Sequence, residues 1–147
     1  MYRQILVPTD GSVLSNKAVA HAIGLAKALG AGVTAFYMSP EYPIPMYAEG
    51  VVIEPVSMDE YKAMAETEAR KIFDDVKAQA QSAGVVCATR HVIASSPWEA
   101  ILAAAGEVKA DAIVMASHGR RGVSAFLLGS ETSRVLTHST LPVIVVR

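Results

Sequence analysis

The sequence predicts an α/β fold built on a five-stranded parallel sheet with helices on both faces, for which we take the open strand order 3-2-1-4-5. Two observations along the 147 residues support this prediction. Short apolar runs alternate with helix-like segments, and the runs are nearly continuous, as in parallel strands that are covered on both faces. Strands joined by right-handed helical crossovers then form a doubly wound, Rossmann-like sheet. The length suits one domain over residues 1–147.

The first strand and the first helix have clear boundaries. Residues 5–7 (Ile-Leu-Val) form an apolar run that stops at Pro8. Ser12 or Ser15 can cap the helix that follows, and Gly30 supplies its C-terminal stop. Apolar residues recur at helical spacing between these points, which predicts one continuous helix.

The middle of the chain combines a second strand, a proline-rich connection and the longest helix. Residues 33–38 are typical of a strand, whereas residues 39–56 contain four prolines and predict a long mobile connection. Ser57 and Glu60 have the spacing of a capping box, in which each side chain accepts from the other residue's backbone N–H. The helix that they open is expected to end at Gly84.

The last third of the chain repeats the alternation. A third strand is expected over residues 85–93. Ser96 and Glu99 have the spacing of a second capping box, with Pro97 at the first helical position, where its missing N–H costs nothing. This helix is expected to end near Lys109. The remaining elements are a strand at 112–115, a helix at 130–138 and a strand at 142–146.

Composition excludes several classes of function. The formal net charge is -1, from 13 basic and 14 acidic residues, so no general attraction to nucleic acid is expected. No apolar stretch has membrane-spanning length, and the start of the chain does not have the pattern of a signal peptide. The single Cys87 lies in an apolar pattern and is expected to be a buried, reduced thiol. We therefore expect a cytoplasmic protein that does not bind membranes.

Two glycine turns predict a phosphate site. Gly119 follows the fourth strand, and Gly129 and Ser130 open the helix after it. Helix N-termini expose unpaired N–H groups with a positive dipole end, and glycine lets a ligand oxygen approach the backbone. In the order 3-2-1-4-5, the loops after strands 1 and 4 are neighbours at the edge where such sheets bind ligands. Arg120 and Arg121 either meet a phosphate there or are solvated loop charges.

The sequence lacks the motifs of several other kinds of functional site. No glycine precedes a lysine, as a Walker phosphate loop requires, and Gly30 and Gly32 lack the third glycine of a dinucleotide motif. Asp10 lacks the acidic partners and lysine of a phosphoacceptor domain. The histidines lack zinc spacing, and Ser124 lacks a nucleophile elbow.

The run of residues 116–130 resembles the nucleotide-binding signature of the universal stress protein family, G-x2-G-x9-G-(S/T), with Ala116 at the position of the first glycine. The opening Ile-Leu-Val-Pro-Thr-Asp-Gly-Ser and the closing Leu-Pro-Val-Ile-Val-Val-Arg extend the resemblance over essentially the whole chain. The resemblance implies a sheet of the adenine nucleotide α-hydrolase type, homodimers, and bound ATP, or AMP or ADP, in the branch that carries the motif.

The resemblance also implies one crevice at the carboxyl ends of the strands. Its expected border consists of Pro8, Thr9 and Asp10 on the adenine and ribose side, Met38 beside the adenine, Met115 and Ala116 under the ribose, His118 and Gly119 beside the phosphates, and Gly129, Ser130 and Thr132 as phosphate donors.

Two residues of this region raise physical questions. A methyl group at Ala116 can crowd the sugar or disfavour a positive φ. Glu131 suits the N-terminal end of a helix dipole, but we expect it beside the triphosphate. There it should repel the ligand unless the phosphates carry Mg²⁺ or Mn²⁺. No further metal site is expected.

Three functions stay open on these grounds. The first is a regulatory stress-response dimer in which ATP orders residues 39–56 and the arginine-bearing arm. The second is a dimerisation module that binds nucleotide poorly and acts through an unknown client protein. The third is a slow ATP-cleaving enzyme, for which only His118, Arg120 and Arg121 offer candidate groups.

The terminal strand, Val143–Val146, is continuously apolar and predicts the dimer interface, because an open apolar edge invites pairing.

Overall fold

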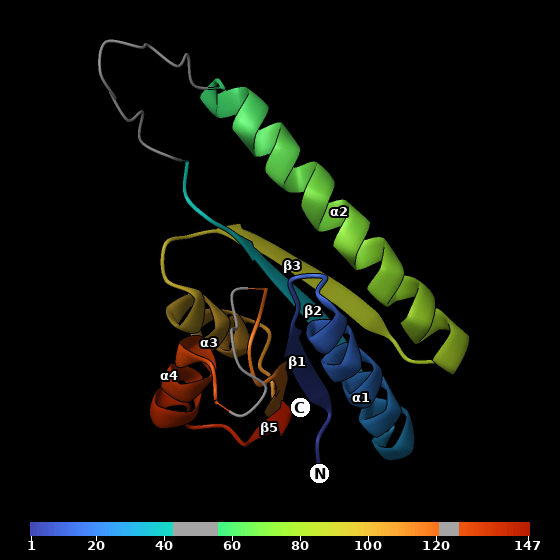
Figure 1. Ribbon diagram of the computed structural model, residues 1–147. Coiled ribbons are helices and arrows are strands. Elements are labelled where there is room, and N and C mark those ends of the chain that lie inside the picture. The colour runs from blue at the N-terminus through green and yellow to red at the C-terminus, as the bar shows by residue number, and fades with distance from the viewer. Residues whose placement is uncertain (43–55, 121–126) are drawn as a thin grey trace.

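The fold is a five-stranded parallel sheet in the order β3-β2-β1-β4-β5, as predicted (Figure 1). The computed structural model describes residues 1–42, 56–120 and 127–147. The strands are β1 (Gln4–Pro8), β2 (Gly32–Ser39), β3 (Cys87–Ile93), β4 (Ala112–Ala116) and β5 (Val143–Val146). Every neighbouring pair is parallel, so all carboxyl ends lie along one edge of the sheet.

Four helices cover the two faces of this sheet (Figure 1). They are α1 (Val13–Leu29), α2 (Met58–Ala83), α3 (Pro97–Glu107) and α4 (Ser130–His138). The buried residues of α1 and α2 share one apolar cluster with Ile5 and Val7 of β1. Those of α3 and α4 share a second cluster with Leu6 of β1. Side chains of a strand alternate between faces, so β1 contributes to both layers.

The first two helices begin as the sequence predicts. Ser12 is the N-cap of α1, and its hydroxyl accepts from the Ser15 N–H at 3.2 Å, which decides between the two candidate caps. The capping box of α2 is confirmed, with the Glu60 N–H on the Ser57 hydroxyl and the Ser57 N–H on the Glu60 carboxylate. Both helices end on a left-handed glycine, Gly30 or Gly84.

The predicted second capping box is wrong. Ser96 precedes α3 but makes no side-chain cap, although Pro97 occupies the first turn as expected. The carboxylate of Glu131, on α4, accepts from the Trp98 N–H at 2.9 Å instead. Arg134 lies 3.6 Å from the other oxygen of Glu131. A carboxylate from the neighbouring helix therefore satisfies a donor that the local serine leaves open.

Smaller differences concern the ends of elements. The third strand begins at Cys87 rather than at residue 85. Cys87 is half-buried rather than fully buried, and burial raises the pKa of its thiol. The expected mobile connection lies mostly outside the described residues, as does Arg121.

Among the described helices, none is both long and apolar enough to pass through a membrane.

Candidate functional site

The predicted site lies where the strand order reverses, at the carboxyl ends of β1 and β4. These strands are adjacent at the centre of the sheet. Loops at such an edge converge on a shared surface, which is where doubly wound sheets bind ligands. The structure brings Asp10, at the end of β1, into contact with Gly119 and Arg120, beyond β4.

Asp10 bridges the two loops. One carboxylate oxygen accepts from the Ser12 N–H at 2.9 Å, and the other accepts from the Arg120 N–H at 2.8 Å. Burial raises the pKa of Asp10, but hydrogen bonds from Ser12, Arg120 and Ser15 outweigh it, so the pKa lies below its ordinary value. The side chain is therefore a carboxylate at neutral pH.

The turn after β4 is held tightly by backbone hydrogen bonds. The Ser117 N–H donates to the Val146 carbonyl at 2.9 Å, and the Ser117 carbonyl accepts from the Gly129 N–H at 2.7 Å. The Ser117 hydroxyl lies 3.2 Å from Nδ1 of His118. Gly129 thus packs directly against Ser117 and His118 and fixes the start of α4 beside the end of β4.

The N-terminus of α4 differs from those of the other helices. Hydroxyls cap α1 and α2, and the Glu131 carboxylate accepts from the first turn of α3. The N-cap of α4 is Gly129, and no described side chain caps this helix. Ser130, the first helical residue, is exposed. The first turn of α4 is therefore the positive end of a helix dipole that no described side chain caps.

Two threonines of the predicted site have structural roles. The Thr132 hydroxyl was expected to donate to a phosphate, but it donates to the Ala116 carbonyl at 3.0 Å, and the residue is 2% exposed. The Thr9 hydroxyl lies 3.1 Å from the Ser15 hydroxyl and accepts from the Gly11 N–H. Both side chains hold the loops in place.

The residues expected near the base and the sugar lie at adjacent strand ends. Pro8 and Met38 are half-exposed at the ends of β1 and β2, whereas Met115, within β4, is buried. Ala116 is also buried. Among the described residues other than glycine, only Lys109 has a positive φ. The alanine at position 116 therefore carries no left-handed strain.

Arg120 is already engaged by α2. Its guanidinium lies 3.3 Å from the Glu68 carboxylate, and the two side chains are 54% and 43% exposed. The guanidinium also passes over Gly11, where a Cβ atom would lie 3.2 Å from Nη2. Sequence reasoning missed Glu68, because nothing in a helix pattern marks a contact made 52 residues away.

The Glu131 side chain has two partners in the structure. Its carboxylate contacts the first turn of α3 and Arg134. The repulsion expected from this residue is therefore reduced by two partners. The Trp98 N–H lies in the first turn of α3, where the positive end of the helix dipole favours a carboxylate.

Ser39 of β2 and His91 of β3 form a polar pair beside α2. The Ser39 hydroxyl is 2.8 Å from Nε2 of His91, whose ring stacks on Tyr37 with centroids 5.6 Å apart. Burial lowers the pKa of His91, and the nearby charge of Glu66 partly opposes this effect. Ser39 is 3% exposed while His91 is half-buried, so the Ser39 hydroxyl itself is not accessible to a substrate.

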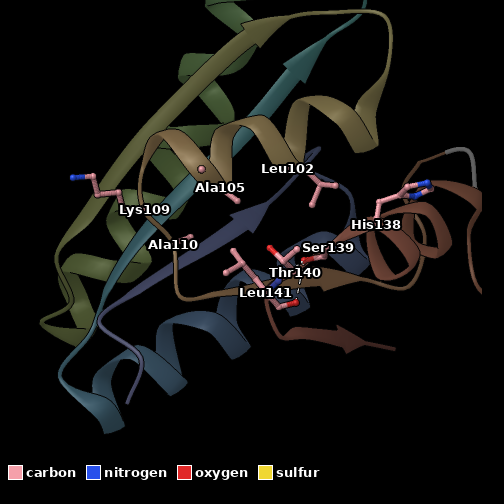
Figure 2. Close-up of a pocket in the computed structure, with 9 residues that line it drawn as sticks. Leu102, Ala105, Lys109, Ala110, His138, Ser139, Thr140 and Leu141 are labelled. Atoms are coloured by element: carbon pink, nitrogen blue, oxygen red, sulfur yellow. Dashed lines mark hydrogen bonds between the residues drawn. The ribbon is translucent and has the colours of Figure 1, made fainter.

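The described surface is hollowed at two places of interest. One of about 260 Å³ adjoins the turn after β4 and is lined by Val13, Leu14, Lys17, Ser117, His118 and Arg147. The other, of about 210 Å³, lies between the C-terminal ends of α3 and α4 (Figure 2). Figure 2 shows the amino group of Lys109 pointing away from this second hollow. This second hollow lies at the opposite edge of the sheet, and no predicted site residue lines it.

In the three described segments of the chain, no three His, Cys, Asp or Glu side chains gather as they would around a metal ion.

The fold and the position of these loops define a Rossmann-like α/β protein with its polar loops at the switch point of the sheet. The chain belongs to the universal stress protein family, whose model matches residues 1–147.

Relatives of this family resemble the chain over its full length. A universal stress protein of Methanocaldococcus jannaschii is 34% identical, covering 100% of this chain and 83% of the relative. Universal stress protein YxiE of Bacillus subtilis is 32% identical, covering 100% of both. A crystal structure of a family member from Burkholderia pseudomallei is 27% identical with a TM-score of 0.75, covering 98% of this chain and 95% of that one. A universal stress protein in complex with cAMP is 29% identical with a TM-score of 0.71, covering 99% and 97%.

Proposed function

We propose that the protein is a regulatory dimer that binds an adenine nucleotide and acts in a stress response. The open N-terminus of α4 carries the nucleotide part of this proposal. Its N-cap is Gly129, and Ser130 is exposed at the switch point of the sheet. Unpaired N–H groups and the positive end of a helix dipole favour a phosphate at this position.

An adenine base is supported by a relative and by the neighbouring strand ends. The 29% identical universal stress protein was crystallised in complex with cAMP. In this chain, Pro8 and Met38 border the adjacent ends of β1 and β2. They offer apolar surface and backbone polar groups, which is the combination that binds a flat, nitrogen-rich ring. ATP is the proposed ligand, with AMP and ADP as shorter forms of the same nucleotide.

Magnesium or manganese is proposed to arrive with the phosphates. The Glu131 carboxylate is occupied by the Trp98 N–H and Arg134, which turns its charge away from the first-turn N–H groups of α4. A divalent cation between phosphate oxygens would neutralise the ligand itself. Oxygen ligands from phosphates and water are what Mg²⁺ prefers.

The dimer is proposed to form through β5. This strand is at the edge of the sheet and consists of Val143, Ile144, Val145 and Val146. An edge strand with an apolar face is stabilised when a second copy pairs with it, and a two-fold axis provides that pairing without leaving a new edge.

We infer that the nucleotide is a signal rather than a substrate. Fast phosphoryl transfer needs a positioned water and preorganised positive charge. The Arg120 guanidinium is paired with Glu68, and Nδ1 of His118 lies beside the Ser117 hydroxyl. This arrangement supports binding more than catalysis. A client protein and a cytoplasmic location stay predictions from the sequence.

Calorimetry with ATP, AMP and cAMP, each with and without Mg²⁺, tests this function. We expect ATP to bind, more tightly with Mg²⁺, and chromatography of the mixture to return intact ATP. Absence of binding by all three nucleotides at millimolar concentration would support the interaction module instead. Single-turnover hydrolysis faster than about 1 per second would make the protein an enzyme.

Releasing Arg120 from α2 is expected to strengthen polyphosphate binding. The Glu68→Gln substitution removes an exposed ion pair, and such pairs contribute up to about 1 kcal/mol, so affinity for ATP should rise by up to roughly fivefold. Asp75→Asn is the matched control, because Asp75 is an exposed carboxylate on the same helix. Weaker ATP binding by Glu68→Gln than by this control would mean that Glu68 holds Arg120 in its binding orientation.

A further inference from the structure

The Asp10 carboxylate accepts hydrogen bonds from backbone N–H groups of two different loops. Both carboxylate oxygens are used, one by the Ser12 N–H at 2.9 Å and the other by the Arg120 N–H at 2.8 Å. The first bond stays within the loop after β1, whereas the second crosses to the loop after β4. Asp10 therefore joins the two loops between which the ligand is proposed to bind.

Gly119 makes this contact possible. A Cβ atom at this position would lie 2.7 Å from the Asp10 carboxylate oxygen that bonds Arg120, which is closer than real Cβ contacts allow. A left-handed backbone does not explain the glycine, because the described glycines with positive φ are Gly11, Gly30 and Gly84. The space above the Cα of Gly119 is occupied by Asp10 rather than left open for a ligand.

We propose that Asp10 is a positioning residue of the nucleotide site, which acts by holding the phosphate-side turn through Gly119 and Arg120. The Asp10 carboxylate, the bare Cα of Gly119 and the Arg120 N–H are together called the Asp10–Gly119 lock. The lowered pKa of Asp10 keeps its carboxylate charged at neutral pH, so the two N–H donors bond to a full negative charge. This inference rests on the proposed function for its effect on binding, but the lock itself is defined by the fold.

The alternative is that Asp10 acts by accepting from the ribose hydroxyls, and the two roles predict different ligand dependence. Calorimetry of the wild type and Asp10→Asn with ATP, 2′,3′-dideoxy-ATP and inorganic tripolyphosphate separates them. A positioning role weakens all three ligands by a similar factor, roughly 10- to 100-fold if one charge-assisted hydrogen bond is lost. A loss confined to ATP, and absent with dideoxy-ATP, overturns the proposal.

A double-mutant cycle tests the lock without any ligand. Gly119→Ala is expected to lower the melting temperature, because the new methyl group displaces the carboxylate from Arg120. In an Asp10→Ala background the same methyl group has room, so its cost should largely disappear. Asp10→Ser provides a second, milder background that also withdraws the carboxylate. Additive effects of the two positions in both backgrounds would overturn the lock.

Gly24→Ala is the matched control for this cycle. Gly24 lies in α1, and a Cβ atom there would meet nothing within 4 Å. Its effect should add to that of Asp10→Ala, because distant sites are independent. If the wild type binds none of the three ligands, the proposed function fails. The melting temperatures then still decide whether Asp10 and Gly119 are coupled.

Discussion

Gly129→Val is expected to destabilise the protein and to abolish nucleotide binding. A Cβ atom at position 129 would lie 2.9 Å from the Ser117 carbonyl oxygen, and 3.1 and 3.2 Å from Cβ and Cα of His118. Backbone atoms cannot rotate away, and Ser117 is itself bonded to Val146 of β5. Overpacking of this kind costs about 1–3 kcal/mol, and each kcal/mol lowers the melting temperature of a chain of this size by roughly 2–4 °C.

The loss of binding has a separate cause. Relief of the clash requires α4 to move away from the end of β4, which carries the first-turn N–H groups at Ser130 out of the site. Thermal unfolding followed by circular dichroism measures the first effect, and calorimetry with ATP measures the second. Unchanged ATP affinity in a folded Gly129→Val protein would show that α4 does not bind the phosphates.

A second glycine shows that the effect of Gly129→Val depends on position. Gly24 is in the interior of α1, with open space where its Cβ would be. Gly24→Ala is expected to stabilise the protein by about 0.5–1 kcal/mol, because alanine loses less backbone entropy in a helix. A destabilising Gly24→Ala would remove this comparison and point to crowding on the surface of α1.

Val145→Pro is expected to convert the proposed dimer to a folded monomer. The carbonyls of Pro142 and Val146 accept from Ile113 and Ser117, so alternate residues of β5 turn their polar groups toward β4. Val145 lies between them in this alternation and directs its N–H to the open edge. Proline removes that donor from an edge strand, where it breaks pairing with a second copy but spares the bonds to β4.

Sedimentation at matched protein concentrations measures this change, with circular dichroism as the test of folding. Ile144→Pro is the informative control, because position 144 is on the side paired with β4 and proline there should unfold the edge of the sheet itself. A dimer that persists in Val145→Pro would place the interface elsewhere. A monomeric wild type would remove the dimer from the proposed function.

Local spacing determined the elements of this protein. The Ser57 and Glu60 capping box joins residues three positions apart, and Gly30 and Gly84 end helices through their own left-handed φ. Apolar runs predicted the strands, because a strand buried on both faces needs apolar side chains on both. Such signals depend on neighbours along the chain, so the sequence alone predicted the fold class, and with it the edge of the sheet where the site is proposed.

Tertiary structure alone decided how the site residues are used. Glu131 and Trp98 are 33 residues apart, so no local pattern could show that this carboxylate replaces Ser96 at the start of α3. Asp10 and the Arg120 N–H are 110 residues apart. The carboxylate that makes this bond also fills the space that a side chain at position 119 would need. A hydrogen bond needs a donor and an acceptor within about 3 Å, and for distant residues the packing of the helices and strands sets that separation rather than the residue types themselves.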